Sequence, residues 1–407
     1  KQQFLDINMK ALTEGYESVE TRFMHLQGNA AEQMLISGSN AVALGAIAAG
    51  LRFYSAYPMS PSTAIMETIA QNADEAGIVV EQAEDEIAAI NMAIGASYAG
   101  ARAMTGTSGG GFSLMVEALG LSGMAEIPLV VIDVQRPGPA TGLPTKTEQS
   151  DLKFVISASQ GEFPRMVIAL RNPSDAFYQT MRAFNMAEKY QIPVILLSDQ
   201  YLGDATYTTK AFDPEKIQMS VPESDYTGHG EYLRYRYMEN GISPRLIPGK
   251  TEQLVSSDSD EHDEHGRIAE SAEVRTRMME KRMKKLEILK QELQFIGEKS
   301  FQTLLIGWGS VWGAMEEAVR LLNQDKNGNA YAALVFGDIY PLPTKLLREK
   351  AAEASRIIDV EQNATGQLAA LIQEETGIIC DDKILRYDGR QISGEEIAEQ
   401  VRKEGIR

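Results

Sequence analysis

The chain has 407 residues, 43% of them hydrophobic and 24% charged, which is the composition of a folded protein with room for two or three domains. Its formal net charge of -18 argues against nucleic acid or an anionic membrane as the main partner, because both repel an acidic surface. One cysteine, Cys380, excludes a disulfide framework and a four-cysteine zinc or iron–sulfur site supplied by this chain alone. The longest apolar run, residues 41–51, is too short to span a bilayer, and with no signal peptide in view we expect a cytoplasmic protein.

Residues from about 30 to 205 alternate between helical and strand-like segments. Two of the expected strands, "PLVVIDVQ" and "PVILLSDQ", are continuous apolar runs, typical of strands buried on both faces of a parallel sheet. The alternation predicts a doubly wound α/β domain. We expect helices over residues 31–50, 62–77 and 84–100, and strands over 51–57, 78–83, 128–135 and 193–200.

The second half of the chain begins with an irregular, acidic stretch that includes "SSDSDEHDEHG". A charged helix is expected over residues 272–294, with Met279, Met283, Leu286 and Leu293 on one stripe. A second α/β pattern starts near residue 300, with strand-like segments at 302–310, 331–343 and 356–363. The predicted organisation is a linker or the end of a preceding unit (1–29), a large α/β domain (30–225), a connector with the charged helix (226–298) and a smaller α/β domain (299–407).

The segment "YPMSPST", residues 57–63, stands between an expected strand and an expected helix. Ser60 is a good helix N-cap, and Pro61 would then occupy the first helical position, so capping alone explains these two residues. Capping does not account for Pro58, or for several hydroxyls at the carboxyl end of a parallel strand, where ligands bind in open α/β sheets. A structural turn and a ligand-binding turn therefore both remain open.

Acidic residues crowd the start of the helix expected over 84–100. Glu81, Glu84 and Asp85 are explained by favourable interaction with the helix dipole. Glu86 differs, because the helix that follows it has hardly any other polar side chain. We regard it as a candidate functional carboxylate, with a dipole-stabilising role as the alternative.

Three further segments carry weaker signals. The Gly-rich "MTGTSGGGFSLM" allows a sharp turn and a close ligand approach, but it matches neither the phosphate loop nor the dinucleotide fingerprint. Arg136 follows a buried strand and offers a planar fork for a carboxylate or phosphate, although a solvated or ion-paired arginine is the simpler reading. His262 and His265 could be taken for metal ligands, but the surrounding composition favours a hydrated loop and we expect no metal site.

Many segments together resemble one family. "YPMSPST", "EDEIAAINMAIGAS", "TSGGGFSLM", "VQRPGPATGLPT", "AFNMAEKYQIPVILLSDQYL", "GISPRLIPG" and "VEQNATGQL" occur in the order seen in alpha subunits of 2-oxoacid:ferredoxin oxidoreductases, most similar to the 2-oxoglutarate branch. The resemblance runs from about Gly28 to the C-terminus. The first residues, "FLDINMKALTEGYE", resemble the end of the gamma domain that precedes alpha in fused members of this family.

The resemblance implies a thiamine diphosphate enzyme whose alpha chain supplies a pyrimidine-binding domain and a transketolase C-terminal-like domain. Glu86 falls on the family's glutamate that hydrogen-bonds N1′ of the aminopyrimidine, and Arg136 falls on its active-site arginine, a candidate for binding the substrate carboxylate. Ser60, where the family usually has threonine, is implied in contacts with substrate and cofactor. Tyr57, Pro58 and Ser108 are the other implied cofactor-binding residues. Gly110 replaces a common proline, which predicts a less rigid turn.

The sequence lacks the GDG…Asn signature that binds diphosphate and Mg²⁺ in this superfamily, and one cysteine cannot hold a cluster. We therefore expect Mg²⁺ and a [4Fe-4S] cluster on a beta subunit, with ferredoxin, coenzyme A and a 2-oxoacid as further partners in an (alpha-beta)2 assembly. The expected reaction is CoA-dependent oxidative decarboxylation of 2-oxoglutarate to succinyl-CoA, or its reverse. Pyruvate or a branched-chain 2-oxoacid is the alternative substrate, and a non-catalytic assembly protein is the alternative of another class.

Overall fold

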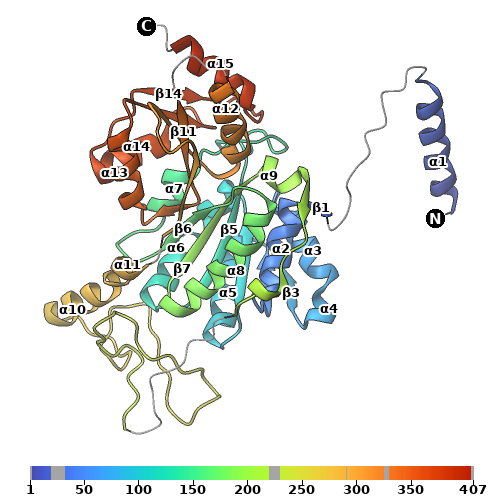
Figure 1. Ribbon diagram of the computed structural model, residues 1–407. Helices are drawn as coiled ribbons and strands as arrows, with labels where there is room; N and C mark the ends of the chain where they lie inside the picture. The colour runs from blue at the N-terminus through green and yellow to red at the C-terminus, as the bar shows by residue number, and fades with distance from the viewer. Residues whose placement is uncertain (1, 20–32, 220–229, 290, 325–329, 405–407) are drawn as a thin grey trace.

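The computed structural model describes residues 2–19, 33–219, 230–289, 291–324 and 330–404 (Figure 1). Two α/β units lie against each other, and helix α1 (Gln2–Glu17) is drawn apart from both. The fold predicted from the sequence, a large doubly wound unit followed by a smaller α/β unit, is confirmed by the two sheets described below. Among the helices of the described residues, none is long and apolar enough to cross a membrane.

The larger unit is built on a seven-stranded sheet. Six neighbouring strands are parallel, and an antiparallel seventh strand, β12, lies at one edge beside β6. In order across the sheet the strands are β12 (Asp338–Tyr340), β6 (Met166–Ala169), β7 (Pro193–Asp199), β5 (Leu129–Gln135), β4 (Ala103–Thr107), β2 (Phe53–Ala56) and β3 (Val79–Gln82). Strands β5 and β7 are buried along their whole length, as their continuous apolar sequences predict.

Helices cover both faces of this sheet. The apolar residues of α2 (Gly38–Ala48), α3 (Thr63–Gln71) and α8 (Pro173–Tyr190) pack on one face. Those of α5 (Glu86–Tyr98), α6 (Gly109–Met124) and α7 (Leu152–Ser157) pack on the other. The short helix α4 (Ala73–Ala76) ends at Gly77, which adopts the left-handed conformation, so the predicted helix end there is confirmed.

The helix predicted over residues 31–50 is wrong in its first part. Strand β1 (Gln33–Ser37) precedes α2 and pairs antiparallel with β8 (Thr206–Lys210), which follows helix α9 (Gln200–Asp204). The Ser37 hydroxyl accepts a hydrogen bond from the backbone N–H of Asn40 and caps α2. Local sequence missed the strand because its partner lies some 170 residues further along the chain.

The smaller unit has a five-stranded sheet. Its strands, in order across the sheet, are β14 (Asp382–Leu385), β13 (Arg356–Glu361), β10 (Thr303–Trp308), β11 (Tyr331–Phe336) and β9 (Leu293–Gly297). All neighbours are parallel except β9, which runs antiparallel to β11. Helices α12 (Trp312–Gln324) and α15 (Gly394–Glu404) pack on one face, and α13 (Thr344–Glu353) and α14 (Gln367–Thr376) pack on the other.

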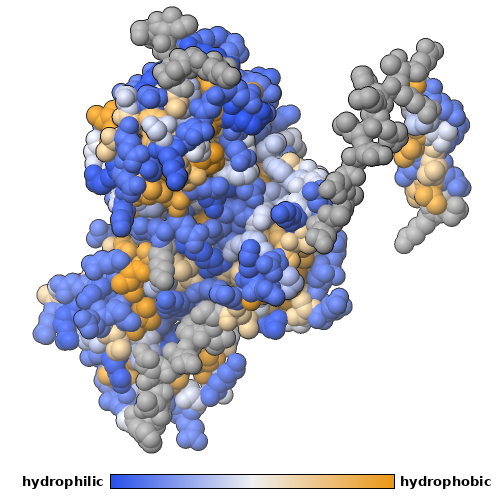
Figure 2. All heavy atoms as spheres, in the orientation of Figure 1, coloured by the Kyte–Doolittle hydropathy of each residue, from blue (hydrophilic) through white to orange (hydrophobic). Residues whose placement is uncertain are grey.

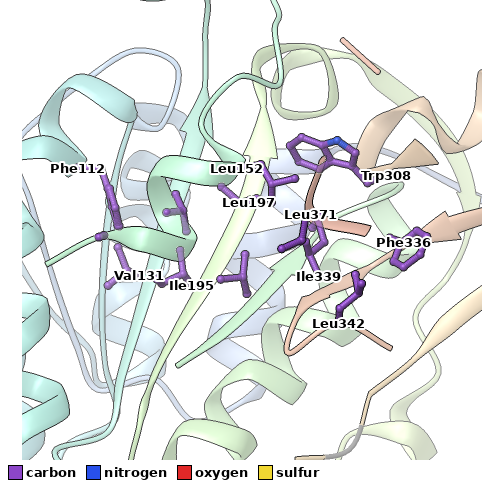
Figure 3. Packing of buried hydrophobic residues seen from close by; sticks show 14 of the residues in the cluster. Phe112, Val131, Leu152, Ile195, Leu197, Trp308, Phe336, Ile339, Leu342 and Leu371 are labelled. Atoms are coloured by element: carbon purple, nitrogen blue, oxygen red, sulfur yellow. The ribbon is translucent and has the colours of Figure 1, made fainter. Parts of the chain in front are cut away.

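The two units share a sheet and a hydrophobic core. The segment predicted as one strand over 331–343 breaks at Gly337, so that β11 joins the smaller sheet and β12 joins the larger one. Figure 3 shows Leu152 and Leu197 of the larger unit near Trp308 and Ile339 of the second half of the chain. The C-terminal half therefore completes one edge of the first sheet and packs over part of its α5–α7 face.

The connector contains two helices instead of the one predicted. Helix α10 (Ala272–Met283) is followed by α11 (Lys285–Ile288), and Leu293 belongs to strand β9. The predicted stripe is therefore wrong at Leu293, while Met279, Met283 and Leu286 are half-buried. The fully buried positions of the two helices are Met278 and three cationic residues, Lys281, Arg282 and Lys285.

Helix α1 presents apolar side chains to solvent. Leu5, Met9, Leu12 and Tyr16 follow one another at spacings of four, three and four residues, and all four are exposed. Figure 2 shows apolar side chains gathered along one side of this helix. The larger part of the surface in that view is hydrophilic, in keeping with the acidic composition.

Candidate active site

The predicted site residues lie at the carboxyl edge of the large sheet. Tyr57 follows β2, Glu86 begins α5 after β3, Ser108 follows β4, and Arg136 follows β5. Because these strands are parallel neighbours, their carboxyl ends meet at one edge. Segments spread over 80 residues thus contribute to one region, as the spacing of strands and turns predicts.

The turn at residues 57–63 differs from the prediction in one respect. Helix α3 begins at Thr63, so Ser60 is not its N-cap and Pro61 is not its first residue. The backbone N–H of Ser62 donates to the carbonyl of Met59 at 2.8 Å, and the Ser62 hydroxyl donates to the same carbonyl at 2.7 Å. Residues 59–62 therefore form a separate turn before α3, where the prediction had a helix cap and the first helical residues. Ser60 is exposed in this turn.

Arg136 is tied to this turn. Its Nη1 donates to the carbonyl of Ser60 at 2.7 Å. The guanidinium has five N–H donors in a fixed fork, so this one bond leaves donors for an anion. Tyr57 and Pro58, which precede Ser60 in the same turn, are half-buried. The sulfur of Met59 accepts a hydrogen bond from Thr107 Oγ1 at 3.9 Å. The structure therefore brings Arg136, the 57–63 turn and the end of β4 together.

Glu86 is the first residue of α5, and its side chain is 3% exposed. The helix cap is the neighbouring Asp85, whose carboxylate accepts a hydrogen bond from the backbone N–H of Ala88 at 2.7 Å. Glu86 is therefore free of the capping role, and its Oε1 is buried with no hydrogen-bond partner among the described residues. A buried carboxylate oxygen without a donor is costly, and such an arrangement suits an atom that a ligand is to satisfy.

The Gly-rich turn at residues 109–111 leaves the space that the Glu86 side chain occupies. A Cβ on Gly111 would collide with Thr107 Oγ1 and would lie 2.5 Å from Glu86 Oε1. A Cβ on Gly110 would meet nothing nearer than a carbonyl oxygen at 3.9 Å. Glycine is thus required at 111 for the close approach of Glu86, whereas position 110 has room for a side chain.

Ser108 lies at the start of α6 and is fully buried. Its side chain makes no cap hydrogen bond, and its Oγ has no partner within the described part of the chain. Ser108 is predicted to bind the cofactor, but its side chain is buried at the start of α6. Its contribution to binding stays a prediction.

Sequence reasoning missed two acidic residues beneath the same turn. Asp133 is fully buried in β5, and Asp151 stands at the start of α7, where its Oδ2 would lie 2.5 Å from a Cβ on Gly109. Burial, and then the neighbouring Asp151, raise the pKa of Asp133 well above its ordinary value. The available signal was an aspartate inside the apolar run "VVIDVQ", since an isolated acid in a buried strand requires a partner.

The acidic segment near residue 262, expected to be hydrated, is exposed at Ser259 and Asp260 but buried at His262. The ring of His262 is buried, lies 3.9 Å from the ring of Tyr235, and its Nδ1 is 2.9 Å from the carbonyl of Asp260. Across residues 2–19, 33–219, 230–289, 291–324 and 330–404, no group of three or more His, Cys, Asp or Glu side chains is arranged to hold a metal ion.

Comparisons with known proteins agree with this geometry. Residues 44–281 match the family model described as pyruvate flavodoxin/ferredoxin oxidoreductase, thiamine diphosphate-binding. The alpha subunit of 2-oxoacid:ferredoxin oxidoreductase 1 from Sulfurisphaera tokodaii is 38% identical, over 97% of this chain and 65% of its own length. The 2-oxoglutarate synthase subunit KorA from Methanothermobacter marburgensis is 31% identical, over 89% of this chain and 96% of its own length.

Solved structures give the same result. The 2-oxoglutarate:ferredoxin oxidoreductase from Magnetococcus marinus, determined with 2-oxoglutarate, coenzyme A and succinyl-CoA bound, superimposes with a TM-score of 0.90 at 35% identity, over 98% of this chain and 71% of that one. A split-gene transketolase, described as an inactive beta4 tetramer, aligns with a TM-score of 0.53 at 13% identity over 90% of this chain and 97% of that one, which concerns the fold alone.

Fold and site together define a thiamine diphosphate-binding α/β protein of the flavodoxin/ferredoxin oxidoreductase class. Within that class, the chain belongs to the 2-oxoacid:ferredoxin oxidoreductase alpha-subunit family. The chain spans about two thirds, 65%, of the length of the Sulfurisphaera relative.

Proposed function

We propose that this chain is the alpha component of a thiamine diphosphate-dependent 2-oxoglutarate:ferredoxin oxidoreductase. The observation that carries the proposal is the buried Oε1 of Glu86, which has no hydrogen-bond partner among the described residues and lies at the carboxyl edge of a sheet of the thiamine diphosphate-binding class. A non-catalytic assembly protein would have no reason to keep a buried carboxylate oxygen without a donor, since that arrangement costs stability.

The residues present fit the cofactor. Glu86 would hydrogen-bond the aminopyrimidine nitrogen N1′ through Oε1, and the low-dielectric surroundings of α5 would strengthen that bond. Tyr57, Pro58 and Ser60 would form the wall that contacts the cofactor from the turn after β2, with Ser108 below the turn after β4. When bound, thiamine diphosphate supplies the nucleophilic carbon and the electron sink that decarboxylation of a 2-oxoacid requires.

Arg136 would bind and orient the substrate carboxylate. The Ser60 carbonyl holds one edge of the guanidinium, so its remaining N–H groups present a fixed fork. The exposed Ser60 hydroxyl lies in the same turn and would donate to the substrate. Both residues would bring the keto carbon into position, which is the part of catalysis that this chain's own side chains supply.

The relatives support 2-oxoglutarate as the substrate. A KorA protein named 2-oxoglutarate synthase aligns over 96% of its length, and the Magnetococcus enzyme was solved with 2-oxoglutarate bound. The Sulfurisphaera relative is named for 2-oxoacids in general, and this observation favours pyruvate or another 2-oxoacid as a second candidate.

A beta subunit would complete the site. Exposed apolar side chains occur on α5, which begins at Glu86, and on the neighbouring α6, including Ile87 (49% exposed), Met92 and Leu114 (50% exposed). Exposed apolar side chains on these two helices suit a subunit interface that closes over the cofactor. The beta subunit would supply Mg²⁺, the diphosphate site and a [4Fe-4S] cluster, within an (alpha-beta)2 assembly that uses ferredoxin and CoA.

Two further parts of the proposal concern organisation and location. We divide the chain into residues 1–29 at the end of a gamma-type domain, a pyrimidine-binding domain (30–225), a connector (226–298) and a transketolase C-terminal-like domain (299–407). The proposed substrates, CoA and ferredoxin, are intracellular, so the proposal implies a cytoplasmic protein.

The test is reconstitution with the partner. The chain is co-purified with its beta subunit, and CoA-dependent reduction of a viologen dye is measured with 2-oxoglutarate, pyruvate and a branched-chain 2-oxoacid. We expect the largest kcat/KM with 2-oxoglutarate. A larger value with pyruvate would transfer the assignment to the second candidate, and no turnover with any 2-oxoacid would contradict the proposed function.

A further inference from the structure

Unpartnered polar atoms concentrate beneath the first turn of α6. Several buried side-chain oxygens here have no hydrogen-bond donor among the described residues. They are the oxygens of Thr105, Ser108 and Asp133, together with Asp151 Oδ2 and Glu86 Oε1. Thr105, Thr107 and Asp133 lie on adjacent strands, and Thr107 is opposite Asp133 in the β4–β5 register. Glu86 is accounted for by the proposed cofactor, but Asp133 and Asp151 are not.

The two aspartates are neighbours. The backbone N–H of Asp151 donates to Gln135 Oε1 at 3.0 Å, and Gln135 follows Asp133 by two residues on the same face of β5. Asp133 is fully buried, Asp151 is half-buried, and each carboxyl group acts on the pKa of the other. Two ionised carboxylates have no proton to donate, so a hydrogen bond between them requires that one of them is protonated.

Burial favours Asp133 as the protonated member of the pair, because Asp133 is fully buried and Asp151 is only half-buried. Burial is the largest cause of the raised pKa of Asp133, and Asp151 adds to it. Asp151 stays the acceptor, and its own pKa is raised by burial and by Glu148, while the hydrogen bond with Asp133 lowers it. The charged groups that act on the pair, Asp133, Asp151 and Glu148, are all acidic, and Glu86 lies across the α6 turn.

The pair and Glu86 contact the same turn from different sides. A Cβ on Gly109 would lie 2.5 Å from Asp151 Oδ2, and a Cβ on Gly111 would lie 2.5 Å from Glu86 Oε1. Residues two apart in a helix point about 200° apart, so the first turn of α6 is held between the acid pair and Glu86. Movement of Asp151 therefore moves the surface against which Glu86 is packed.

We propose that Asp133 and Asp151 are positioning residues for Glu86, because one shared proton joins the two carboxyl groups and fixes the first turn of α6. This role in catalysis rests on the function proposed above. Loss of the proton would place two like charges in contact, drive Asp151 away from Gly109 and loosen the turn.

The direction of the pH effect follows from the raised pKa. An aspartate titrates near 3.9 in the unfolded chain, and Asp133 titrates above that value in the folded chain. Its contribution to stability is present below about pH 4 and is lost as the pH rises through the folded pKa. The first turn of α6 is therefore most firmly held on the acid side of that transition.

The experiment uses the reconstituted alpha–beta complex with Asp133→Asn, Asp133→Ala and the exposed control Asp74→Asn. Infrared difference spectra at pH 7 report protonated carboxyl groups, and hydrogen exchange of the amides at 108–112 reports the turn. We expect Asp133→Asn and Asp133→Ala to lose one protonated-carboxyl band that Asp74→Asn keeps. Asp133→Ala should speed exchange at 108–112, and Asp133→Asn, which still donates to Asp151, should restore slow exchange.

Kinetics of the same complexes test the link to Glu86. In Asp133→Ala the misplaced turn should lower kcat about 100-fold with little change in KM. Asp133→Asn should recover most of that loss. It should also keep its activity to a higher pH than the wild type, because its amide cannot lose a proton in this range. A protonated-carboxyl band that persists in Asp133→Asn, or unchanged exchange and kcat in Asp133→Ala, would overturn the proposal. If the wild-type complex turns over no 2-oxoacid while the band and the exchange change as expected, the proposed function fails and the shared proton stands.

Discussion

At the scale of single residues, the proposal assigns different roles to Glu86 and Arg136. Glu86 is buried, and its Oε1 has no hydrogen-bond partner within the described part of the chain, so it suits a bond to a ring nitrogen. Arg136 is held by one backbone carbonyl and keeps donors for an anion. Neighbouring residues Asp85 and Ser62 take the capping and turn roles that would otherwise occupy Glu86 and Ser60.

Arg136→Lys should raise KM for the 2-oxoacid more than it lowers kcat. Lysine keeps the charge but loses the bidentate fork, which is worth about 1–3 kcal/mol in a charged hydrogen bond. Steady-state kinetics of the alpha–beta complex with varied 2-oxoacid and saturating CoA measure the effect. An unchanged KM would show that Arg136 does not bind the substrate carboxylate.

Ser60→Thr would restore the residue that the resemblance leads us to expect at this position. The hydroxyl is kept and a methyl group is added to an exposed position, so the fold should be unaffected. We expect unchanged thermal stability and a smaller ratio of kcat/KM between 2-oxoglutarate and pyruvate, since the added methyl leaves less room for the longer substrate. An equal or larger ratio would remove Ser60 from the residues that determine specificity.

At the scale of elements, the first turn of α6 is the part that packs against Glu86. The sequence predicted the Gly-rich turn but not the reason for each glycine, because the reason lies in Glu86, Thr107 and Asp151, which come from other elements. Similarly, the charge pattern predicted a helix near residue 280 but not its buried face. Lys281, Arg282 and Lys285 are buried because Glu126 and Glu261 lie opposite them, and those partners are distant in sequence.

Gly111→Ala and Gly110→Ala are a matched pair on this turn. The Gly111→Ala methyl would lie 2.5 Å from Glu86 Oε1, so it should destabilise the protein by about 1–3 kcal/mol and weaken thiamine diphosphate binding. The Gly110→Ala methyl would meet only a carbonyl oxygen at 3.9 Å, so this variant should leave the stability equal or raise it by up to about 1 kcal/mol. Thermal unfolding of both variants, with calorimetric titration of the cofactor into the Gly111→Ala complex, checks this. Equal melting temperatures would contradict the packing argument.

Glu126 anchors the connector to the larger unit. Its carboxylate pairs with Lys281 and Lys285 at 2.5 Å, and all three side chains are buried. Burial by itself raises the pKa of Glu126, but Lys281, Lys285 and Arg234 outweigh burial and hold this pKa well below its usual range. The opposing cations outnumber the anion, so the cluster depends on this one carboxylate.

Glu126→Ala should destabilise the protein by about 3–5 kcal/mol, because two buried ammonium groups lose their partner. Denaturant unfolding at pH 7 measures the change. The exposed Glu75→Ala, on the other side of the larger unit, is the control and should change the free energy of unfolding by less than about 0.5 kcal/mol. A similarly small change in the free energy of unfolding for Glu126→Ala would contradict the argument, because it would mean that the two ammonium groups do not need this carboxylate.

At the scale of the whole molecule, the two α/β units form one structure. Strand β12 of the second half of the chain completes the edge of the first sheet, and Arg182 of α8 binds Asp338 of β12 through two bonds of 2.7 Å. Periodicity predicted both α/β units and their parallel strands, because these depend on local pattern. It could not predict that residues 331–343 divide between two sheets, since that depends on long-range pairing.

The central claim is that Glu86 Oε1 is the catalytic contact of a 2-oxoacid:ferredoxin oxidoreductase. Glu86→Gln in the alpha–beta complex tests it most directly, with the exposed Glu84→Gln as matched control and CoA-dependent dye reduction with 2-oxoglutarate as the readout. We expect Glu86→Gln to lower kcat by at least about 100-fold, within the range that a positioned acid–base group contributes, and Glu84→Gln to match the wild type. A Glu86→Gln complex that turns over at the wild-type rate would contradict the account.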